Sequence, residues 1–515
     1  MVIPETREPD QVAEAVTAEK ATAGGIQGTL RALFPLAPEA APRTWMRRGM
    51  AAAAQIAAVG LGAWVLLLRI PGLPSWDAVY AEDWWEFLVG AYQHPWRLFT
   101  PFGGYEQLLQ RVIAQFVSFL PVSQAAHVFA GAGALVTALC ALFIYHASSG
   151  HIRSVPLRVL LAAGVILLSS APMEIADSTV NAPWYLLLAM FWAALWRPRT
   201  RSGMAAAAAI GFFTAASTTL SIVFAPLLLV RVFALRRFRE HAVTAGWLAG
   251  CLVQVPIIIM SYVQGQSRLG GYGPADGSNN RLGGSLTFYA HDVVLRAIGW
   301  HLSWRLESHT ARDWATAIVA IALVAVFAVI LATQPRTRPF VVVALLTGFV
   351  FSMISTFLTP WVTVAPVTIQ HESAARYTAL PIFLIEAAVI VGVDSALRKR
   401  RGVREQRGAV EGGAVEGGAG ERNERRRWYA RIGLVPALAV TALVVILATS
   451  WAVDFRYQGI RTVPQSGRWA LHVQKLRTQC QNSPTGLLRV NGPTDGTFET
   501  GYPKYTWIPC ARIKL

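Results

Sequence analysis

Two adjacent acidic residues, Glu82 and Asp83, follow the first long apolar stretch of the sequence. Carboxylates are costly near hydrocarbon, so a pair at this depth indicates a water-filled cavity and a function. The next two residues, Trp84 and Trp85, suit the headgroup layer of a bilayer. The pair therefore predicts a reaction centre at a membrane surface. The alternative is a solvated acidic turn ahead of an interfacial helix.

The composition is that of a membrane protein. The chain has 515 residues, of which 54% are hydrophobic and 15% are charged, whereas soluble proteins carry about 25% charged residues. The formal net charge is +17, but most of the excess lies in short links between apolar stretches, as in cytoplasmic loops of membrane proteins. We therefore interpret the charge as a topology signal and expect a lipid bilayer, and no nucleic acid, as partner.

Eleven stretches are apolar enough to predict spans of about 20 residues each. They lie near 49–69, 123–146, 156–171, 182–196, 203–219, 220–235, 242–263, 314–333, 339–358, 378–396 and 431–452. The predicted fold class is an all-α polytopic membrane protein with juxtamembrane helices in its first outer loop. The region 203–235 has an alternative, a single segment broken around Ser217-Thr218-Thr219.

The short basic links set the orientation of these spans. With the N-terminus inside, all of them fall on the cytoplasmic side; they carry Arg153, Arg158, Arg197, Arg199, Arg201, Arg236, Arg237, Arg239, Arg336, Arg338 and Arg398-Lys399-Arg400-Arg401. The outer side then carries the long loops 70–122, 264–313 and 359–377 and the tail from Asp454. We expect a multi-pass protein of the plasma membrane that works on its outer face.

Three polar segments adjoin the predicted membrane domain, which covers residues 43–453. Residues 1–42 are predicted to be a disordered cytoplasmic N-terminus. The Gly- and Arg-rich residues 397–430 predict a disordered basic cytoplasmic loop. Residues 454–515 predict a small extracytoplasmic cap of mixed or β character.

The four cysteines are of two kinds. Cys480 and Cys510 lie in the polar tail, and an oxidising outer compartment would join them in a disulfide. Cys140 and Cys251 lie within spans and are predicted to be small buried apolar side chains. The tail also holds aromatic residues that either stack on sugar rings or form its core: Tyr502, Tyr505 and Trp507.

The first outer loop resembles that of a known enzyme superfamily. It consists of a span, the acidic pair, an interfacial helix, a Gly103-Gly104 turn and a second interfacial helix from Tyr105 to Phe119. This order is similar to that of the GT-C superfamily of polytopic glycosyltransferases, in particular its actinobacterial and ArnT/RgtA-like branches. The resemblance covers residues 45–455. It implies transfer of a sugar from a polyprenyl-phosphate donor to a cell-envelope glycan or glycolipid at the outer face.

The family's acidic residues match Glu82 and Asp83, and analogy favours Asp83. An inverting transfer needs one carboxylate to take the proton of the acceptor hydroxyl, and cations to stabilise the departing lipid phosphate. Arg376 with Tyr377 resembles the family's phosphate-facing pair, since Arg binds phosphate in a bidentate manner. The alternative is that Arg376 and Tyr377 are interfacial anchors. We expect an acid of the pair within roughly 10–15 Å of Arg376.

Further residues are candidates for the donor and for a metal. His371 and Arg111 are predicted to contact the donor phosphate. No cofactor is certain, but a divalent metal, Mg²⁺ or Mn²⁺, is possible, with His371 and Glu372 near it. His291, Asp292 and Arg296, in a predicted surface helix over 286–304, are weaker candidates for the site.

A third group, Glu174, Asp177 and Asn181, lies between two spans. Its spacing places Glu174 with Asp177, or Asp177 with Asn181, on one face of a helical turn. These side chains are predicted to bind acceptor hydroxyls; the alternative is a polar cap for the helix ends.

Other catalytic machinery has no motif in this sequence. The Walker loop, the Cys-x-x-Cys and His-Glu-x-x-His motifs and the Rossmann fingerprint are all missing, which speaks against ATP-driven pumps, zinc centres and nucleotide-sugar enzymes. Three alternatives to a transferase are considered: a transporter or flippase, a polymerase or ligase of lipid-linked glycans, and a noncatalytic envelope-assembly protein.

Overall fold

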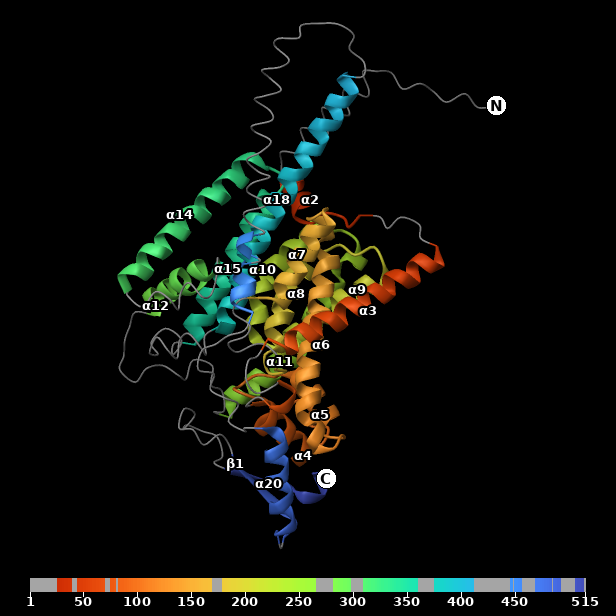
Figure 1. The fold of residues 1–515 in the computed structure, drawn as a ribbon, viewed down its shortest axis with the longest axis vertical. Helices are drawn as coiled ribbons and strands as arrows, with labels where there is room; N and C mark the ends of the chain where they lie inside the picture. The colour runs from red at the N-terminus through yellow and green to blue at the C-terminus, as the bar shows by residue number, and fades with distance from the viewer. Residues whose placement is uncertain are drawn as a thin grey trace.

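The computed structural model of the protein describes most of the chain. The described residues are 26–38, 44–69, 75–79, 82–168, 178–264, 281–297, 309–359, 375–411, 445–447, 449–455, 468–483, 485–491 and 505–513. Helices make up nearly all of the regular structure among them, and the one sheet has two strands (Figure 1).

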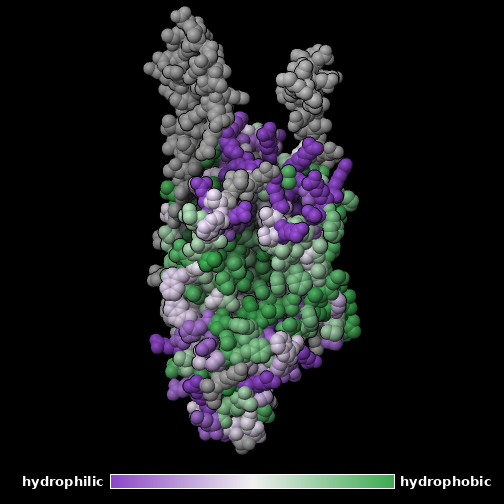
Figure 2. Space-filling model, turned by 90° about the vertical axis from the view of Figure 1, so that its right-hand side faces the viewer, coloured by the Kyte–Doolittle hydropathy of each residue, from purple (hydrophilic) through white to green (hydrophobic). Residues whose placement is uncertain are grey.

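Six helical stretches of this part are long and apolar enough to cross a bilayer. They contain α3 (Trp45–Leu67), α6 (Ala125–Ala147), α11 (Ala242–Val263), α14 (His309–Thr333), α15 (Arg338–Leu358) and the first two-thirds of α18 (Ala375–Glu411). On the face drawn in Figure 2, hydrophobic residues form a broad band with hydrophilic residues at both ends. This is the architecture of an all-α membrane protein.

Four of the other predicted spans correspond to shorter helices. They are α7 (Val155–Ile166), α8 (Ala182–Leu195), α9 (Arg201–Ser217) and the stretch Thr219–Ala234, which includes α10 (Ala225–Ala234). The predicted span 431–452 lies largely outside the described residues. The count of eleven spans therefore stays a prediction.

The chain breaks between α9 and α10, where the sequence offered a choice between two spans and one interrupted segment. Thr218 is extended (φ −154°, ψ 133°), and its side chain accepts the backbone N–H of Leu220. The break leaves Ser217 at the end of α9, buried and with its hydroxyl available to another element.

Glycines let α9 and α11 pack backbone to backbone. A Cβ at Gly246 would lie 2.0 Å from the carbonyl oxygen of Ala208, and one at Gly250 would lie 2.5 Å from that of Phe212. Small residues permit this close approach between membrane helices. Because both helices advance in the same direction along the contact, Ser217 and Gln254 lie close to each other, and the first loop binds both.

One predicted disordered segment is folded in part. Residues 26–33 form α2 (Ile26–Leu33), and Phe34 is fully buried. Arg199 Nε donates to the carbonyl of Ala37 over 2.8 Å. Disorder throughout residues 1–42 is thus wrong for 26–38, because apolar residues there fill a gap between α10 and α15 that composition alone does not reveal. Likewise, α18 continues to Glu411, into the predicted 397–430 loop.

The tail forms a small unit of one helix and a strand pair. α20 (Trp469–Gln481) is followed by β1 (Leu487–Asn491) and β2 (Tyr505–Pro509), which pair antiparallel with Arg489 opposite Trp507. The predicted disulfide joins Cys480 at the end of α20 to Cys510 just after β2, with the Cα atoms 5.7 Å apart.

This tail unit packs against the first loop. Trp469 lies edge-to-face on Trp84 with ring centroids 5.1 Å apart, and its indole N–H donates to the carbonyl of Val122 over 2.8 Å. In Figure 1, α20 and β1 lie at the same end of the molecule as α4 (Val89–Gln93) and α5 (Leu108–Val117), and opposite the C-terminal end of α18. The first loop and the tail thus build one end of the molecule together.

Candidate functional site

The acidic pair opens an unusual helical turn. Residues 83–88 form a wide π-type helix (Asp83–Leu88) that leads directly into α4, with Glu82 as the residue before it. Such turns are rare and often occur at functional sites. The turn places the two neighbouring acids in different surroundings: Asp83 is 1% exposed, whereas Glu82 is half-buried.

Asp83 is fully engaged by the segment that precedes α8. Its carboxylate accepts hydrogen bonds from the Ser178 hydroxyl (3.1 Å), the backbone N–H groups of Thr179 and Val180 (3.0 Å each) and the Thr179 hydroxyl. Burial raises the pKa of Asp83 to about 7, although the bonds from Thr179 and Ser178 lower it. Four donors on two buried oxygens leave little room for a substrate proton. The geometry makes Asp83 an anchor for residues 178–180.

Glu82 has a different neighbour, Arg376. Burial raises the pKa of Glu82, the Glu82 backbone N–H and the positive charge of Arg376 lower it, and the charge of Glu86 raises it. Arg376 lies in the first turn of α18, with its guanidinium 5.3 Å from the ring centroid of Tyr377. The structure therefore brings the start of α18 to the first loop, and brings Glu82 and Arg376 within electrostatic range of each other.

Tyr105 completes this group. Burial raises the pKa of the Tyr105 phenol to about 12, and the charges of Tyr377, Arg376 and Glu82 act on it as well. Tyr377, in turn, packs edge-to-face on Trp184 of α8, with centroids 5.3 Å apart. Glu82, Tyr105, Arg376 and Tyr377 thus lie near one another. This group joins the acidic pair with residues from the first loop and from α18.

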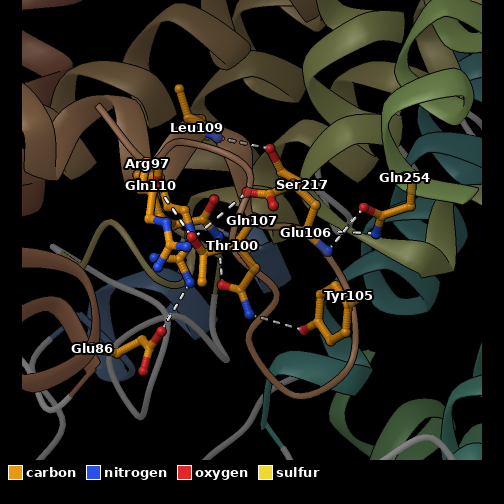
Figure 3. Close-up of polar contacts among 11 residues, drawn as sticks. Glu86, Arg97, Thr100, Tyr105, Glu106, Gln107, Leu109, Gln110, Ser217 and Gln254 are labelled. Atoms are coloured by element: carbon orange, nitrogen blue, oxygen red, sulfur yellow. Dashed lines mark hydrogen bonds and ion pairs between the residues drawn. The ribbon is translucent and has the colours of Figure 1, made fainter. Parts of the chain in front are cut away.

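The segment that carries Tyr105 is fixed to the break between α9 and α10 (Figure 3). The backbone N–H of Glu106 donates to Gln254 Oε1 over 3.0 Å, and Gln254 Nε2 donates back to the Glu106 carbonyl over 3.4 Å. The backbone N–H of Leu109 donates to the Ser217 hydroxyl over 3.1 Å. Two polar side chains from the closely packed α9 and α11 thus position the start of α5.

A short chain of amides then orients the phenol. Gln110 Nε2 donates to Gln107 Oε1 over 3.0 Å, and Gln107 Nε2 donates to the Tyr105 hydroxyl over 3.2 Å (Figure 3). Gln107 and Gln110 are almost completely buried. Buried amides with defined partners rigidify a site, so Gln107 and Gln110 fix the position of the Tyr105 hydroxyl.

Arg111, predicted as a donor-phosphate ligand, is held between two carboxylates. Its Nη2 lies 2.9 Å from Glu86 Oε1, and its Nε lies 3.7 Å from Glu106 Oε1. Arg111 is 6% exposed and Glu106 is 0% exposed. Burial raises the pKa of Glu106 to about 8, and the Arg111 charge opposes this shift. We call Glu86, Arg111 and Glu106 the charged triad; its geometry gives Arg111 carboxylate partners instead of an open side for a phosphate.

Several predicted residues fall outside the part of the chain that is described, or at its edge. Glu174, Asp177, His371 and Glu372 lie outside it. Asn181 is described: it is 1% exposed and directly precedes α8, next to the segment that Asp83 holds. The structure thus places the end of the predicted acceptor group beside the acidic pair. Within the described residues, no group of three or more His, Cys, Asp or Glu side chains is arranged to hold a metal.

The weaker candidates pair with one another. Asp292 and Arg296 form an ion pair in and just after a second π-type turn (Tyr289–Val294), and Arg296 is fully buried. His291 Nε2 lies 3.2 Å from Asp313 Oδ1 at the start of α14. The Asp292–Arg296 pair is local to this stretch, and the His291–Asp313 contact links the turn to α14.

Sequence reasoning assigned no role to Tyr105, Glu106 or Gln254. The signal for Gln254 was present, because it is an amide within the apolar stretch 242–263, and polar groups in a span need a partner. The partner, the Glu106 backbone, could not be read from the sequence.

No family model, no curated protein and no solved structure matches this chain. Its function is therefore inferred from the residues described above and from their chemistry.

Proposed function

We propose that this protein is a membrane glycosyltransferase that moves a sugar from a polyprenyl-phosphate donor to a hydroxyl of a cell-envelope glycan or glycolipid. One observation carries the proposal: the Glu82 carboxyl and the Arg376 guanidinium interact at the end of the membrane domain built by the first loop. A proton acceptor beside a fixed cation is what this transfer requires.

In the proposed reaction, each of the two groups has one role. As the acceptor oxygen attacks the anomeric carbon, its proton passes to the Glu82 carboxylate. The bond from the anomeric carbon to the phosphate oxygen breaks, and polyprenyl phosphate leaves with the electron pair. Arg376 neutralises the charge that grows on the phosphate, and no general acid is needed. Attack opposite to the leaving group inverts the anomeric configuration.

Between the two acids, the geometry favours Glu82 as the base, contrary to the analogy that favoured Asp83. A base must first reach the proton that it takes, and only then does its pKa matter. Burial raises the pKa of Asp83 to about 7, a suitable value, but its two oxygens are occupied by residues 178–180. Glu82 is half-buried, and its pKa is also raised.

The membrane setting supports a lipid-linked donor. The prenyl chain of such a donor would lie among the apolar helices, with its phosphate at their polar end. Arg376 stands in the first turn of α18, at the boundary between the span Arg376–Lys399 and the loop before it. The basic links predict that this end faces outward.

The test uses the full-length protein in lipid nanodiscs with a panel of polyprenyl-phosphate hexoses and pentoses and an envelope glycan extract. We expect release of free polyprenyl phosphate from one of the donors, together with transfer of labelled sugar into the extract. Nucleotide sugars should give no transfer. Movement of an intact donor across the bilayer of proteoliposomes, with no polyprenyl phosphate released from any donor, would replace the transferase by a flippase.

A further inference from the structure

Arg111 is a buried cation with two buried acids as partners. It comes from α5, whereas Glu86 comes from the π-type turn and Glu106 from the loop before α5. The guanidinium also lies over the Phe87 ring, 5.4 Å from its centroid. One cation cannot neutralise two ionised carboxylates. Burial raises the pKa of Glu106 to about 8 while the Arg111 charge opposes this shift, so the protonated form of Glu106 is favoured at neutral pH.

The charge of Arg111 is then directed to Glu86. The distances agree with this assignment, because Glu86 lies at 2.9 Å and Glu106 at 3.7 Å. Glu86 follows Glu82 by four positions in the same helical stretch, and the charge of Glu86 raises the pKa of Glu82. Whatever neutralises Glu86 therefore acts on Glu82.

Among the described residues, the charged and titratable groups that act on Glu82 or on its neighbours come from three elements. The π-type turn supplies Asp83 and Glu86, the loop before α5 supplies Tyr105, and α18 supplies Arg376 and Tyr377. Arg376 is the positive member of this set and Glu86 is an acid whose charge Arg111 controls. The pKa of Glu82 thus depends on Arg111 through Glu86, although Arg111 and Glu82 lie on different elements.

We propose that Arg111 is a positioning residue for the general base: by pairing with Glu86, it removes a negative charge from beside Glu82 and keeps Glu82 ready to accept a proton. The proposal rests on the proposed function of Glu82. It gives Arg111 an electrostatic role in place of phosphate binding, and it makes the charged triad part of the active site without contact to substrate.

The experiment follows the ionisation of Glu82 itself and so does not depend on turnover. The infrared carbonyl band of protonated Glu82 is obtained by subtracting the titration of Glu82→Gln from that of the full-length protein in nanodiscs. The titration is repeated in Arg111→Gln, in Glu86→Gln and in the double variant. Arg97→Gln, which removes an exposed arginine of the same loop, is the matched control.

We expect Arg111→Gln to move the Glu82 titration to higher pH by about 0.5–1 unit, the size for two charges one helical turn apart in partly screened surroundings. Glu86→Gln should titrate at a lower pH than the unchanged protein, because the raising charge of Glu86 is gone, and the double variant should titrate close to the unchanged protein. An Arg111→Gln titration that coincides with the unchanged protein and with Arg97→Gln would overturn the proposal.

If Arg111→Gln does not fold, Glu86→Gln decides, because absence of a downward shift there is equally fatal. Failure of the proposed function gives a different result: Arg111→Gln would still shift the Glu82 titration as expected, but the unchanged protein would release no polyprenyl phosphate from any donor.

Discussion

Burial raises the pKa of the Glu82 carboxyl and the positive charge of Arg376 opposes this rise, although Glu82 follows the first span and Arg376 begins a late one. Long-range pairs of this kind are set by tertiary packing, here by α18 and the first loop meeting at one end of the molecule. In the proposed transfer reaction, a base and a cation must be held at a fixed separation, with the reacting groups of the substrates between them.

Replacing Asp83 by Asn should lower the stability of the folded protein, because Asp83 binds residues 178–180 and is not the proposed base. An amide keeps one acceptor oxygen but presents an NH₂ group to a backbone N–H of Thr179 or Val180. A buried donor without an acceptor costs about 1–3 kcal/mol. We expect a lower unfolding temperature in detergent and faster proteolysis near residues 178–180. A variant of unchanged stability that has lost turnover would instead make Asp83 the base.

Replacing Arg376 by Lys should weaken the donor's phosphate contact while the charge is kept. A lysine cannot form the bidentate contact of a guanidinium, and we expect kcat/KM for the donor to fall by about 10- to 100-fold, mainly through a higher KM. The measurement is initial rate against donor concentration. Equal kinetic constants for Arg376→Lys and the unchanged protein would show that Arg376 only anchors α18 in the interface.

Glu106 should make the protein less stable as pH rises. Its folded pKa of about 8 exceeds the ordinary value of 4.5, so the folded state holds a proton that the unfolded state releases. Stability is full below the ordinary pKa and declines as pH rises towards the folded pKa, above which the loss is complete. Glu106→Gln mimics the protonated form and should abolish this dependence.

We expect the stabilisation by Glu106→Gln to be close to zero at pH 4 and about 2–4 kcal/mol at pH 8, the range reflecting partial compensation by Arg111. Thermal unfolding in detergent at the two pH values measures it. Glu240→Gln, which removes an acid from the opposite, basic end, serves as a control. A stabilisation that is equal at both pH values would mean that the pKa of Glu106 is the same in the folded and the unfolded state.

Removing the disulfide should loosen the tail unit and, through it, the first loop. Replacing both Cys480 and Cys510 by Ser removes the constraint on a loop with a sequence separation of 30, which is worth about 3.7 kcal/mol in the chain-entropy estimate. Trp469 should then lose its fixed place on Trp84, which tryptophan fluorescence quenching reports. Unchanged quenching would show that the apolar contacts alone hold the tail.

The sequence predicted the features that depend on composition and local order. Apolar stretches marked the spans because a bilayer demands about 20 apolar residues, and the six long ones are present. The Cys480–Cys510 disulfide followed from the two tail cysteines. The segment 26–38 was mispredicted, because its burial depends on neighbours far along the chain.

The site itself could be predicted only in part. The residue types Glu82 and Arg376 were identifiable, since charged groups beside a span are conspicuous. The different surroundings of Glu82 and Asp83 could not be predicted, because they depend on hydrogen-bond donors from residues 178–180 that bind Asp83. The partners of Arg111 also lie on other elements, so its isolated position in the sequence suggested a phosphate ligand.

The central claim is that Glu82 accepts the acceptor's proton beside a phosphate held by Arg376. The most direct measurement is the rate of polyprenyl phosphate release by Glu82→Gln in nanodiscs, with donor affinity measured on the same sample. We predict that the rate falls by about 10²–10⁴-fold. Donor affinity should stay within about twofold of the unchanged protein, and the unfolding temperature within a few degrees. Release at an undiminished rate would contradict the account.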